Sequence, residues 1–184
     1  AEMTNFGLPV PPGLTITTKN CMEYIDNGNK IPDDLMEEVK NALKDVEKQT
    51  NKKFGDKDNP LLLSVRSGAK ISMPGMMETI LNLGLNDETL LGLINLTQNE
   101  RFAYDSYRRF LTMFGSVVLE IDRQKFENEI IKIKDEEKVC LDSEISAEGL
   151  KKLISIYKNL IQNEIGFEFP QDPYKQLEMA IEAV

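Results

Sequence analysis

Histidine is absent from this chain of 184 residues. Its absence excludes a Ser-His-Asp triad, a Cys-His nucleophile pair, a His-ligated metal and a phosphohistidine carrier within the chain. The chain also has no Gly-x-x-x-x-Gly-Lys-Ser/Thr segment, so it has no Walker A phosphate loop. Any chemistry must therefore use carboxylates, arginine, lysine, hydroxyl groups and backbone N–H groups.

Cysteine is scarce and long apolar runs are missing. Cys21 and Cys140 form no Cys-x-x-Cys pair, which predicts ordinary thiols in a reducing compartment rather than a zinc site or a disulfide framework. No apolar stretch approaches roughly 18 residues, so no transmembrane helix is expected. The N-terminus has no charged segment followed by an apolar run, so no secretory signal is expected either.

Positive charge is also in deficit, because the formal net charge is −9. Binding to nucleic acid or to an anionic membrane needs a basic surface, so we predict neither partner. A phosphate ligand remains compatible with this charge, since a local site can be positive on an acidic protein.

The N-terminal half mixes extended and helical patterns. The β-branched segment 14–18 predicts a short strand, and a helix follows that ends at Gly28. A second helix is predicted from Pro32 to about Val46, because apolar residues recur there at helical spacing. The apolar run 61–65 predicts a buried strand.

From about residue 87 the sequence predicts one helix after another. The apolar stripes of these helices are Tyr107, Phe110, Phe114, Val117 and Ile121; Phe126, Ile130 and Ile133; Leu150, Leu153, Ile154, Tyr157, Leu160 and Ile161; and Leu177, Ala180, Ile181 and Val184. The predicted fold class is α+β: an α/β part over 1–86, an all-helical part over 87–170, and a helix over 171–184 that returns to the first part. The last helix ends on its apolar stripe without a cap, so we expect the chain to be cut rather than complete there.

The segment 64–86 contains the strongest candidate site. Arg66 follows the predicted strand directly, where a turn of small residues leaves backbone N–H groups free to face an anion. Arginine offers phosphate oxygens a planar, permanently charged fork, and Lys70 adds a second cation. Gly68 and Gly75 let the backbone approach a ligand closely.

The loop 72–77 combines the Ser72 hydroxyl with a hinge glycine and flexible thioethers such as that of Met77, a composition suited to folding over a phosphate chain. Thr79 is predicted near the start of the next helix, where N–H groups point outward. The residues alone leave a plainer alternative open. An arginine after a strand often forms a surface ion pair, and methionines often fill a core.

Three weaker features have plainer interpretations. The acidic run Asp135–Glu137 predicts a solvated turn rather than a cation site. Arg108 and Arg109 predict pairing on a helix surface rather than an anion site. The apolar stripe that begins at Tyr107 predicts core packing, not a platform for base stacking.

A long segment resembles a known family. From residue 64 to residue 86 the chain reads Ser-Val-Arg-Ser-Gly-Ala-Lys-Ile-Ser-Met-Pro-Gly-Met-Met-Glu-Thr-Ile-Leu-Asn-Leu-Gly-Leu-Asn. This segment resembles the phosphate-binding segment of the pyruvate, phosphate dikinases. The opening Gly-Leu-Pro-Val-Pro-Pro-Gly at 7–13, the helical segment 100–110 and the ending 176–184 are similar to the same family. The resemblance therefore covers essentially the whole chain.

The resemblance implies a partial ATP-grasp-like nucleotide-binding domain of a phosphotransferase with paired acceptors. Such an enzyme interconverts ATP, phosphate and pyruvate with AMP, diphosphate and phosphoenolpyruvate, using Mg²⁺ and a phosphohistidine on a separate domain. It implies a homodimer of the full-length protein, located in the cytoplasm, or in an organelle if a targeting segment lies outside this sequence.

The resemblance also implies roles for individual residues. Arg66 matches the family's arginine on the ATP phosphates, and Gly75 and Met77 match its loop over the polyphosphate. The same motif contains Ser67, Gly68, Lys70, Ser72 and Thr79. The family's Gly-Gly-Lys segment is expected before Ala1, and its Mg²⁺ ligands after Val184, so this chain would supply one wall of the ATP site and no metal ligand.

Two departures from the family pattern are minor: Glu78 stands where aspartate is more frequent, and Leu14 where phenylalanine is. One alternative is a phosphoenolpyruvate synthase-like ATP-binding domain, but the segment 70–77 departs from that family's acidic version. A non-catalytic nucleotide-binding or interaction module, or a regulatory paralogue without the carrier domain, also fits the composition.

Overall fold

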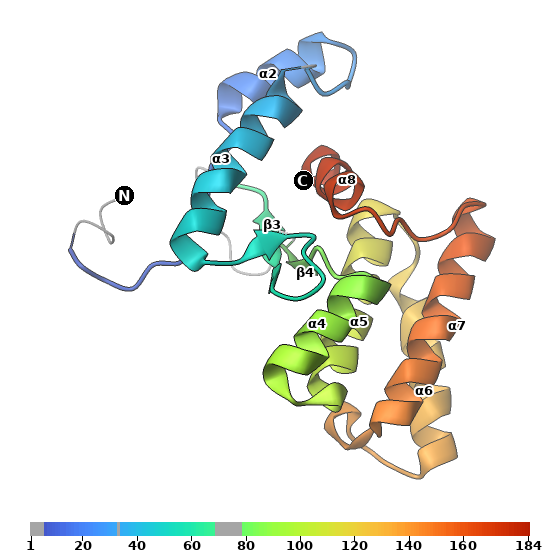
Figure 1. The fold of residues 1–184 in the computed structure, drawn as a ribbon. Helices are drawn as coiled ribbons and strands as arrows, with labels where there is room; N and C mark the ends of the chain where they lie inside the picture. Colours follow the sequence, from blue (N-terminus) through green and yellow to red (C-terminus); the bar gives the residue numbers. More distant parts are fainter. Residues whose placement is uncertain (1–5, 33, 69–78) are drawn as a thin grey trace. The chain divides into compact units, whose positions relative to one another are not determined.

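The computed structural model describes residues 6–32, 34–68 and 79–184 of the chain (Figure 1). The chain forms two compact units, Ala1–Lys53 and Phe54–Val184. Helices and short strands occur together, which confirms the α+β class. No helix in the described ranges is long and apolar enough to cross a membrane.

The described residues of the first unit form helices α2 (Thr18–Asp26) and α3 (Leu35–Thr50). The strand predicted over 14–18 is wrong: residues 14–17 are irregular, and Thr18 already begins α2. A strand needs a partner for its backbone groups, and the described part of this unit offers none before Lys53. The stop near Gly28 is confirmed, since Asn27 caps α2 and Gly28 has a φ of 69°.

Helix α3 buries the apolar stripe that its spacing predicted. Leu35, Val39, Leu43 and Val46 are buried, while the charged residues between them are exposed. The helix begins at Leu35 rather than at Pro32, and Asn51 ends it in the left-handed conformation with a φ of 52°.

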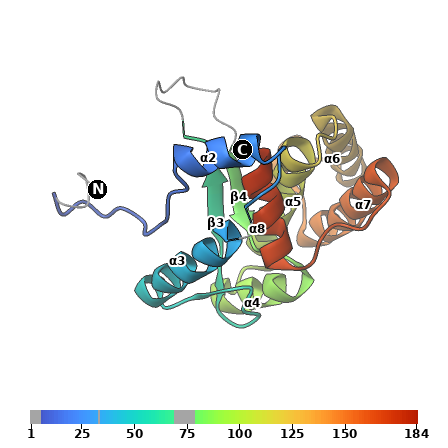
Figure 2. The ribbon, with the colours of Figure 1, turned by 90° about the horizontal axis from the view of Figure 1, so that it is seen from above.

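The second unit begins with two small sheets. Strand β1 (Lys53–Phe54) pairs with β2 (Pro60–Leu61), and β3 (Leu63–Arg66) pairs with β4 (Thr79–Leu83) in antiparallel orientation. Strand β3 is only half-buried rather than buried as predicted. Strand β4 packs against α5 and α8 (Figure 2), and its Ile80 and Leu83 are fully buried. The apolar face of the ribbon therefore belongs mainly to β4.

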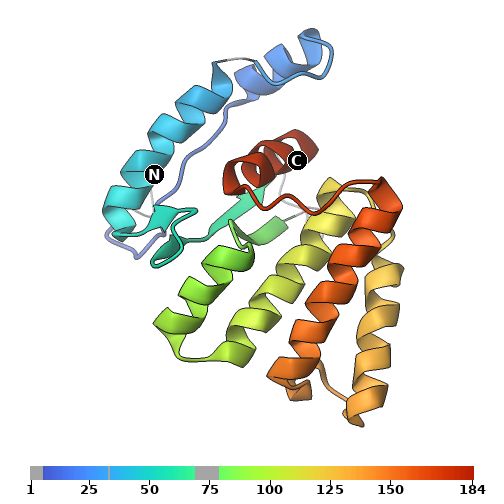
Figure 3. The ribbon, with the colours of Figure 1, turned by 45° about the vertical axis from the view of Figure 1, so that its right-hand side comes forward.

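Helices make up most of the remainder of this unit, as the sequence predicted. They are α4 (Asp87–Thr97), α5 (Glu100–Met113), the π-helical turn Phe114–Val118, α6 (Arg123–Glu137), the 3₁₀ turn Asp142–Glu144, α7 (Ala147–Ile165) and α8 (Pro173–Ala183). Helix α5 packs against α4 and α7, and α6 packs against α7 (Figure 3).

Aromatic side chains form the centre of this helical core. Phe169, from the segment after α7, makes edge-to-face contacts with Tyr107, Phe110 and Phe114 of the predicted stripe. Such pairs add about 0.5–1.5 kcal/mol each beyond the area they bury. The stripe is therefore core, as predicted.

Two details of the helical region differ from the sequence prediction. The acidic run Asp135–Glu137 ends helix α6 instead of forming a turn, and Glu137 accepts hydrogen bonds from the Ser146 backbone N and Oγ at 2.8 and 2.5 Å. In α8, Leu177 and Ala180 are buried as predicted, but Val184 follows the helix and is exposed.

Candidate functional site

The β3–β4 ribbon carries the candidate site at one end. Arg66, the last residue of β3, is the cross-strand partner of Thr79, the first residue of β4. Residues opposite each other in an antiparallel pair point to the same face of the sheet. Arg66 and Thr79 therefore share one face, while Val65 and Ile80 share the other, which is the core side.

A β-bulge sets this pairing. From the pair Leu63–Leu83 to the pair Val65–Ile80, β3 advances by two residues and β4 by three. The extra residue lies at Leu81–Asn82, and Asn82 has a left-handed φ of 61°. The bulge allows Ile80 and Leu83 to face the core together, although simple alternation would place them on opposite faces.

The Arg66 side chain is exposed at this end of the ribbon. No carboxylate in the described ranges pairs with its guanidinium, which argues against the surface ion pair that the sequence left open as an alternative. Because no described carboxylate pairs with it, this guanidinium is a candidate partner for a phosphate oxygen.

The remaining predicted site residues fall into two groups. Ser67 and Gly68 follow Arg66 directly and are half-buried and exposed, respectively. The residues Lys70, Ser72, Gly75 and Met77 lie outside the described residues. The prediction that Thr79 lies near a helix start is wrong. Thr79 is the first residue of β4, which pairs with β3 up to Leu83.

The helix that follows β4 starts at a well-built cap. The Asn86 side chain accepts hydrogen bonds from the backbone N of Glu88 and of Thr89 at 2.9 and 2.7 Å, and Thr89 Oγ1 accepts one from Asn86 N at 2.8 Å. This reciprocal capping box fixes where α4 begins. The helix start, Asp87, is thus eight residues beyond Thr79.

A buried glutamine joins the turn between β4 and α4 to the C-terminal helix. Gln176 of α8 is fully buried, and its Oε1 accepts a hydrogen bond from Gly84 N at 3.1 Å. Its Nε2 donates to Leu85 O at 3.0 Å and to Pro170 O at 2.8 Å. Sequence reasoning missed Gln176, and its only signal was a polar residue one turn before Ala180 on a buried stripe.

A second link joins α4 to α7 beside the core. Lys158 Nζ pairs with Asp87 and lies 5.2 Å from the centre of the Tyr107 ring. Asp87 also accepts a hydrogen bond from the Tyr107 hydroxyl at 3.3 Å. Burial and the Asp87 charge raise the pKa of Tyr107. The phenol is thus a neutral structural donor at physiological pH, not an acid–base group.

The two arginines at 108 and 109 have protein partners. Arg108 is buried and donates from Nη2 to Asp105 Oδ1 at 2.8 Å, and Arg109 donates from Nε to Asp105 Oδ2 at 2.9 Å. One carboxylate therefore holds both guanidinium groups on α5. This confirms pairing along the helix, although Arg108 lies at a buried rather than an exposed position.

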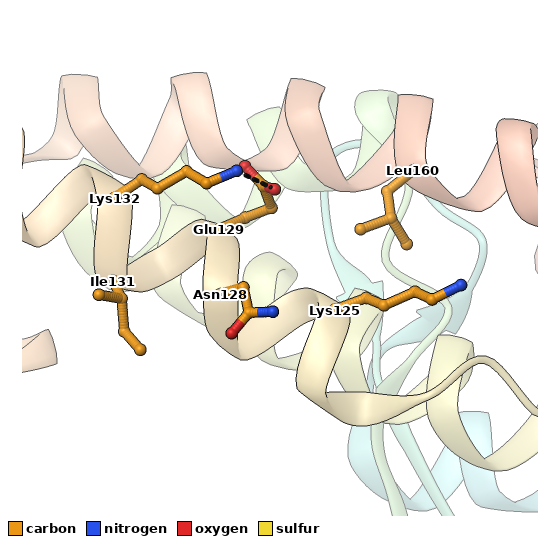
Figure 4. Close-up of a pocket in the computed structure, with 6 residues that line it drawn as sticks. All are labelled: Lys125, Asn128, Glu129, Ile131, Lys132 and Leu160. Carbon is orange, nitrogen blue, oxygen red and sulfur yellow. Dashed lines mark hydrogen bonds and ion pairs between the residues drawn. The ribbon is translucent and has the colours of Figure 1, made fainter.

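A hollow of about 540 Å³ opens elsewhere, along α6 and α7 (Figure 4). Its lining residues are Lys125, Asn128, Glu129, Ile131, Lys132 and Leu160. Its charges already pair: Lys132 with Glu129 at 2.7 Å and Lys125 with Glu164 at 2.6 Å. Of the described residues predicted to bind phosphate, none lines this hollow.

Comparison with known proteins connects the ribbon end to a family. The family model "Pyruvate phosphate dikinase, AMP/ATP-binding domain" matches residues 28–148, which include the whole β3–β4 ribbon. The chain is 53% identical over 182 residues to pyruvate, phosphate dikinase of Entamoeba histolytica. This match covers 99% of the chain and 21% of that protein.

Two further relatives agree. Identity is 53% over 184 residues with the chloroplastic pyruvate, phosphate dikinase of Flaveria pringlei, and 47% over 185 residues with that of Clostridium symbiosum. Both matches cover 100% of this chain, but only 19% and 21% of those proteins. The chain thus spans about a fifth of the length of these relatives.

This chain belongs to the family of the pyruvate, phosphate dikinase AMP/ATP-binding domain. The assignment confirms the resemblance carried by the segment 64–86. The names of these relatives do not favour the phosphoenolpyruvate synthase alternative.

Proposed function

We propose that this chain forms one wall of an ATP site and that Arg66 binds the ATP phosphates. The observation that carries the proposal is the placement of Arg66 in a chain of this family. Its guanidinium is exposed at the end of a β ribbon, opposite Thr79 and without a carboxylate partner in the described ranges. Ser67, Gly68, Lys70, Ser72, Gly75, Met77 and Thr79 complete the proposed phosphate-binding set.

The proposed chemistry is positioning and charge neutralisation. Phosphoryl transfer needs little covalent help from the protein, and it depends on cations and N–H groups aimed at the charge that builds on the transferred group. Arg66 would hold that charge at a fixed place because its strand is paired and β4 is packed against α5 and α8. The phosphoryl acceptor would be a histidine of another domain, since this chain has none.

The whole protein is proposed to interconvert ATP, phosphate and pyruvate with AMP, diphosphate and phosphoenolpyruvate. In this proposal, residues 1–86 and 171–184 contribute to an ATP-grasp-like subdomain and residues 87–170 form a helical one. The full-length protein would be a cytoplasmic homodimer, bind no nucleic acid or membrane, and pass the phosphoryl group to its own phosphohistidine domain.

Magnesium is expected with the ATP rather than on this chain. The described ranges contain no group of three or more Asp, Glu, His or Cys side chains that fits a metal ion. In the proposal, its protein ligands come from outside this sequence.

An ATP titration with three proteins tests the role of Arg66. The full-length protein and its Arg66→Ala and Arg123→Ala variants are titrated with ATP in the presence of Mg²⁺. Arg123 is the matched control, because it is an exposed arginine that pairs with Glu127 one turn along α6. We expect Arg66→Ala to lower ATP affinity about tenfold or more, as for the loss of a charge-assisted contact, and Arg123→Ala to leave it unchanged. Equal affinities of all three proteins would contradict the proposal.

A further inference from the structure

The bulge in β4 decides which residue faces Arg66. If the register of the pair Leu63–Leu83 continued without interruption, Arg66 would face Ile80. The observed partner is Thr79. Without the bulge, Arg66 and the fully buried Ile80 would have to share a face, which would place a guanidinium in the core or an isoleucine in water.

Asn82 is the residue on which the bulge depends. Its φ of 61° lies in the left-handed region, which asparagine tolerates far better than β-branched residues do. Its Nδ2 donates a hydrogen bond to Ser106 O at 3.3 Å, and Ser106 is buried on α5. Asn82 thus supplies both the backbone conformation of the bulge and a tether from the ribbon to the helix behind it.

The turn after the bulge also restrains the backbone of Asn82. Leu85 N donates a hydrogen bond to Asn82 O at 3.2 Å, and Gly84, two residues after Asn82, has a φ of 102°. A Cβ at Gly84 would lie 2.7 Å from Cε2 of Phe54, so the chain can turn here only with glycine. The bulge is therefore fixed on the α5 side by Ser106 and on the α4 side by this turn.

We propose that Asn82 is a positioning residue for phosphate binding: by holding the β4 bulge, it sets the register that brings Thr79 opposite Arg66 on the solvent face of the ribbon. This inference rests on the proposed function of Arg66. Asn82 acts through the backbone and does not touch the ligand. Its loss should displace Arg66 relative to Thr79, and displacements of this kind weaken ligand positioning strongly.

Two substitutions separate the conformation of Asn82 from its side chain. Asn82→Val disfavours the left-handed conformation and removes the tether, so it should restore the uninterrupted register. Asn82→Gly removes the tether but keeps the conformation, so it should retain the bulge. Arg66→Ala serves as the reference for lost phosphate contact, and Asn82→Ala replaces the valine variant if that variant does not fold.

The register is read directly by nuclear Overhauser effects (NOEs) between backbone protons of this chain. Function is read by titrating the full-length protein with ATP in the presence of Mg²⁺. In the wild type and in Asn82→Gly, we expect cross-strand NOEs from Arg66 to Thr79 and ATP affinities within about threefold of each other. In Asn82→Val, we expect these NOEs to move to Ile80 and ATP affinity to fall about tenfold. Rescue of affinity by the glycine variant distinguishes a set register from a general loss of stability.

Two results would overturn the positioning role. One is an Arg66–Thr79 NOE that persists in Asn82→Val, and the other is a register that moves to Ile80 without any loss of ATP affinity. Equal affinities of the wild type and Arg66→Ala would instead refute the proposed function of Arg66, and with it any role of Asn82 in ATP binding. The NOE comparison would still show whether Asn82 sets the register.

Discussion

Replacing Gln176 with methionine should destabilise the second unit strongly. Gln176 is fully buried, and it satisfies three backbone groups at once: the N–H of Gly84 and the carbonyls of Leu85 and Pro170. Methionine has a similar length and no comparable donor or acceptor, so it fills the space but leaves these groups without their partner.

The magnitude follows from those three groups. A buried polar group left without a partner costs about 1–3 kcal/mol. Three such groups give a loss of about 3 kcal/mol in the free energy of unfolding as the lower estimate. A marginally stable domain has about 5–15 kcal/mol in total, so this loss is a large fraction of it.

Chemical denaturation followed by circular dichroism measures this loss. The matched control is Gln162→Met, the same substitution at an exposed position of α7, which should change the free energy of unfolding by no more than about 0.5 kcal/mol. The reasoning would be refuted if the two variants had the same stability. A loss in Gln176→Met alone would show that the glutamine joins α8 to the corner after β4.

Two further predictions concern the helical core. Burial raises the pKa of Tyr157 to about 12, above the ordinary value of about 10, so the folded state holds this proton more tightly. The stability that this bound proton contributes is complete below about pH 10 and is lost as pH rises toward 12. Tyr157→Phe should therefore flatten the fall in the free energy of unfolding between these pH values. An unchanged slope would contradict the role of Tyr157. Gly92→Ala should lower stability by about 1–3 kcal/mol, because its Cβ would meet the carbonyl oxygen of Lys57; a melting temperature equal to or above that of the wild type would contradict this.

Helical spacing predicted much of the second unit correctly. The stripes that include Phe126, Ile130 and Leu153 are buried, and Ser146 caps α7 by accepting a hydrogen bond from Gly149 N at 2.9 Å. Long amphipathic helices repeat their pattern over several turns, so local sequence specifies them well.

The strands were harder to predict because pairing decides them. The β-branched segment 14–18 has strand propensity but no strand partner among the described residues; residues 14–17 are irregular, and Thr18 begins α2. Thr79 was expected near a helix start, yet its pairing with Arg66 places it in β4. Long-range pairing overrode local preference in both cases.

The sequence predicted the candidate site only in part, for the same reason. Its central arginine could be chosen from the sequence, because arginine after a strand and before small residues suits an anion. Asn82 was missed, although the spacing of three between Ile80 and Leu83 was a signal for a bulge. Spacing by two defines a regular strand, so buried residues three apart require an extra residue between them.

The most direct test is to map ATP binding to the full-length protein, with this chain as the isotope-labelled segment, from amide chemical shifts in the presence of Mg²⁺. If Arg66 binds the ATP phosphates, the largest saturable shifts occur at Arg66, Ser67, Gly68 and Thr79, around the end of the β3–β4 ribbon. Shifts confined to the hollow along α6 and α7, or an absence of saturable shifts at the ribbon end, would contradict it.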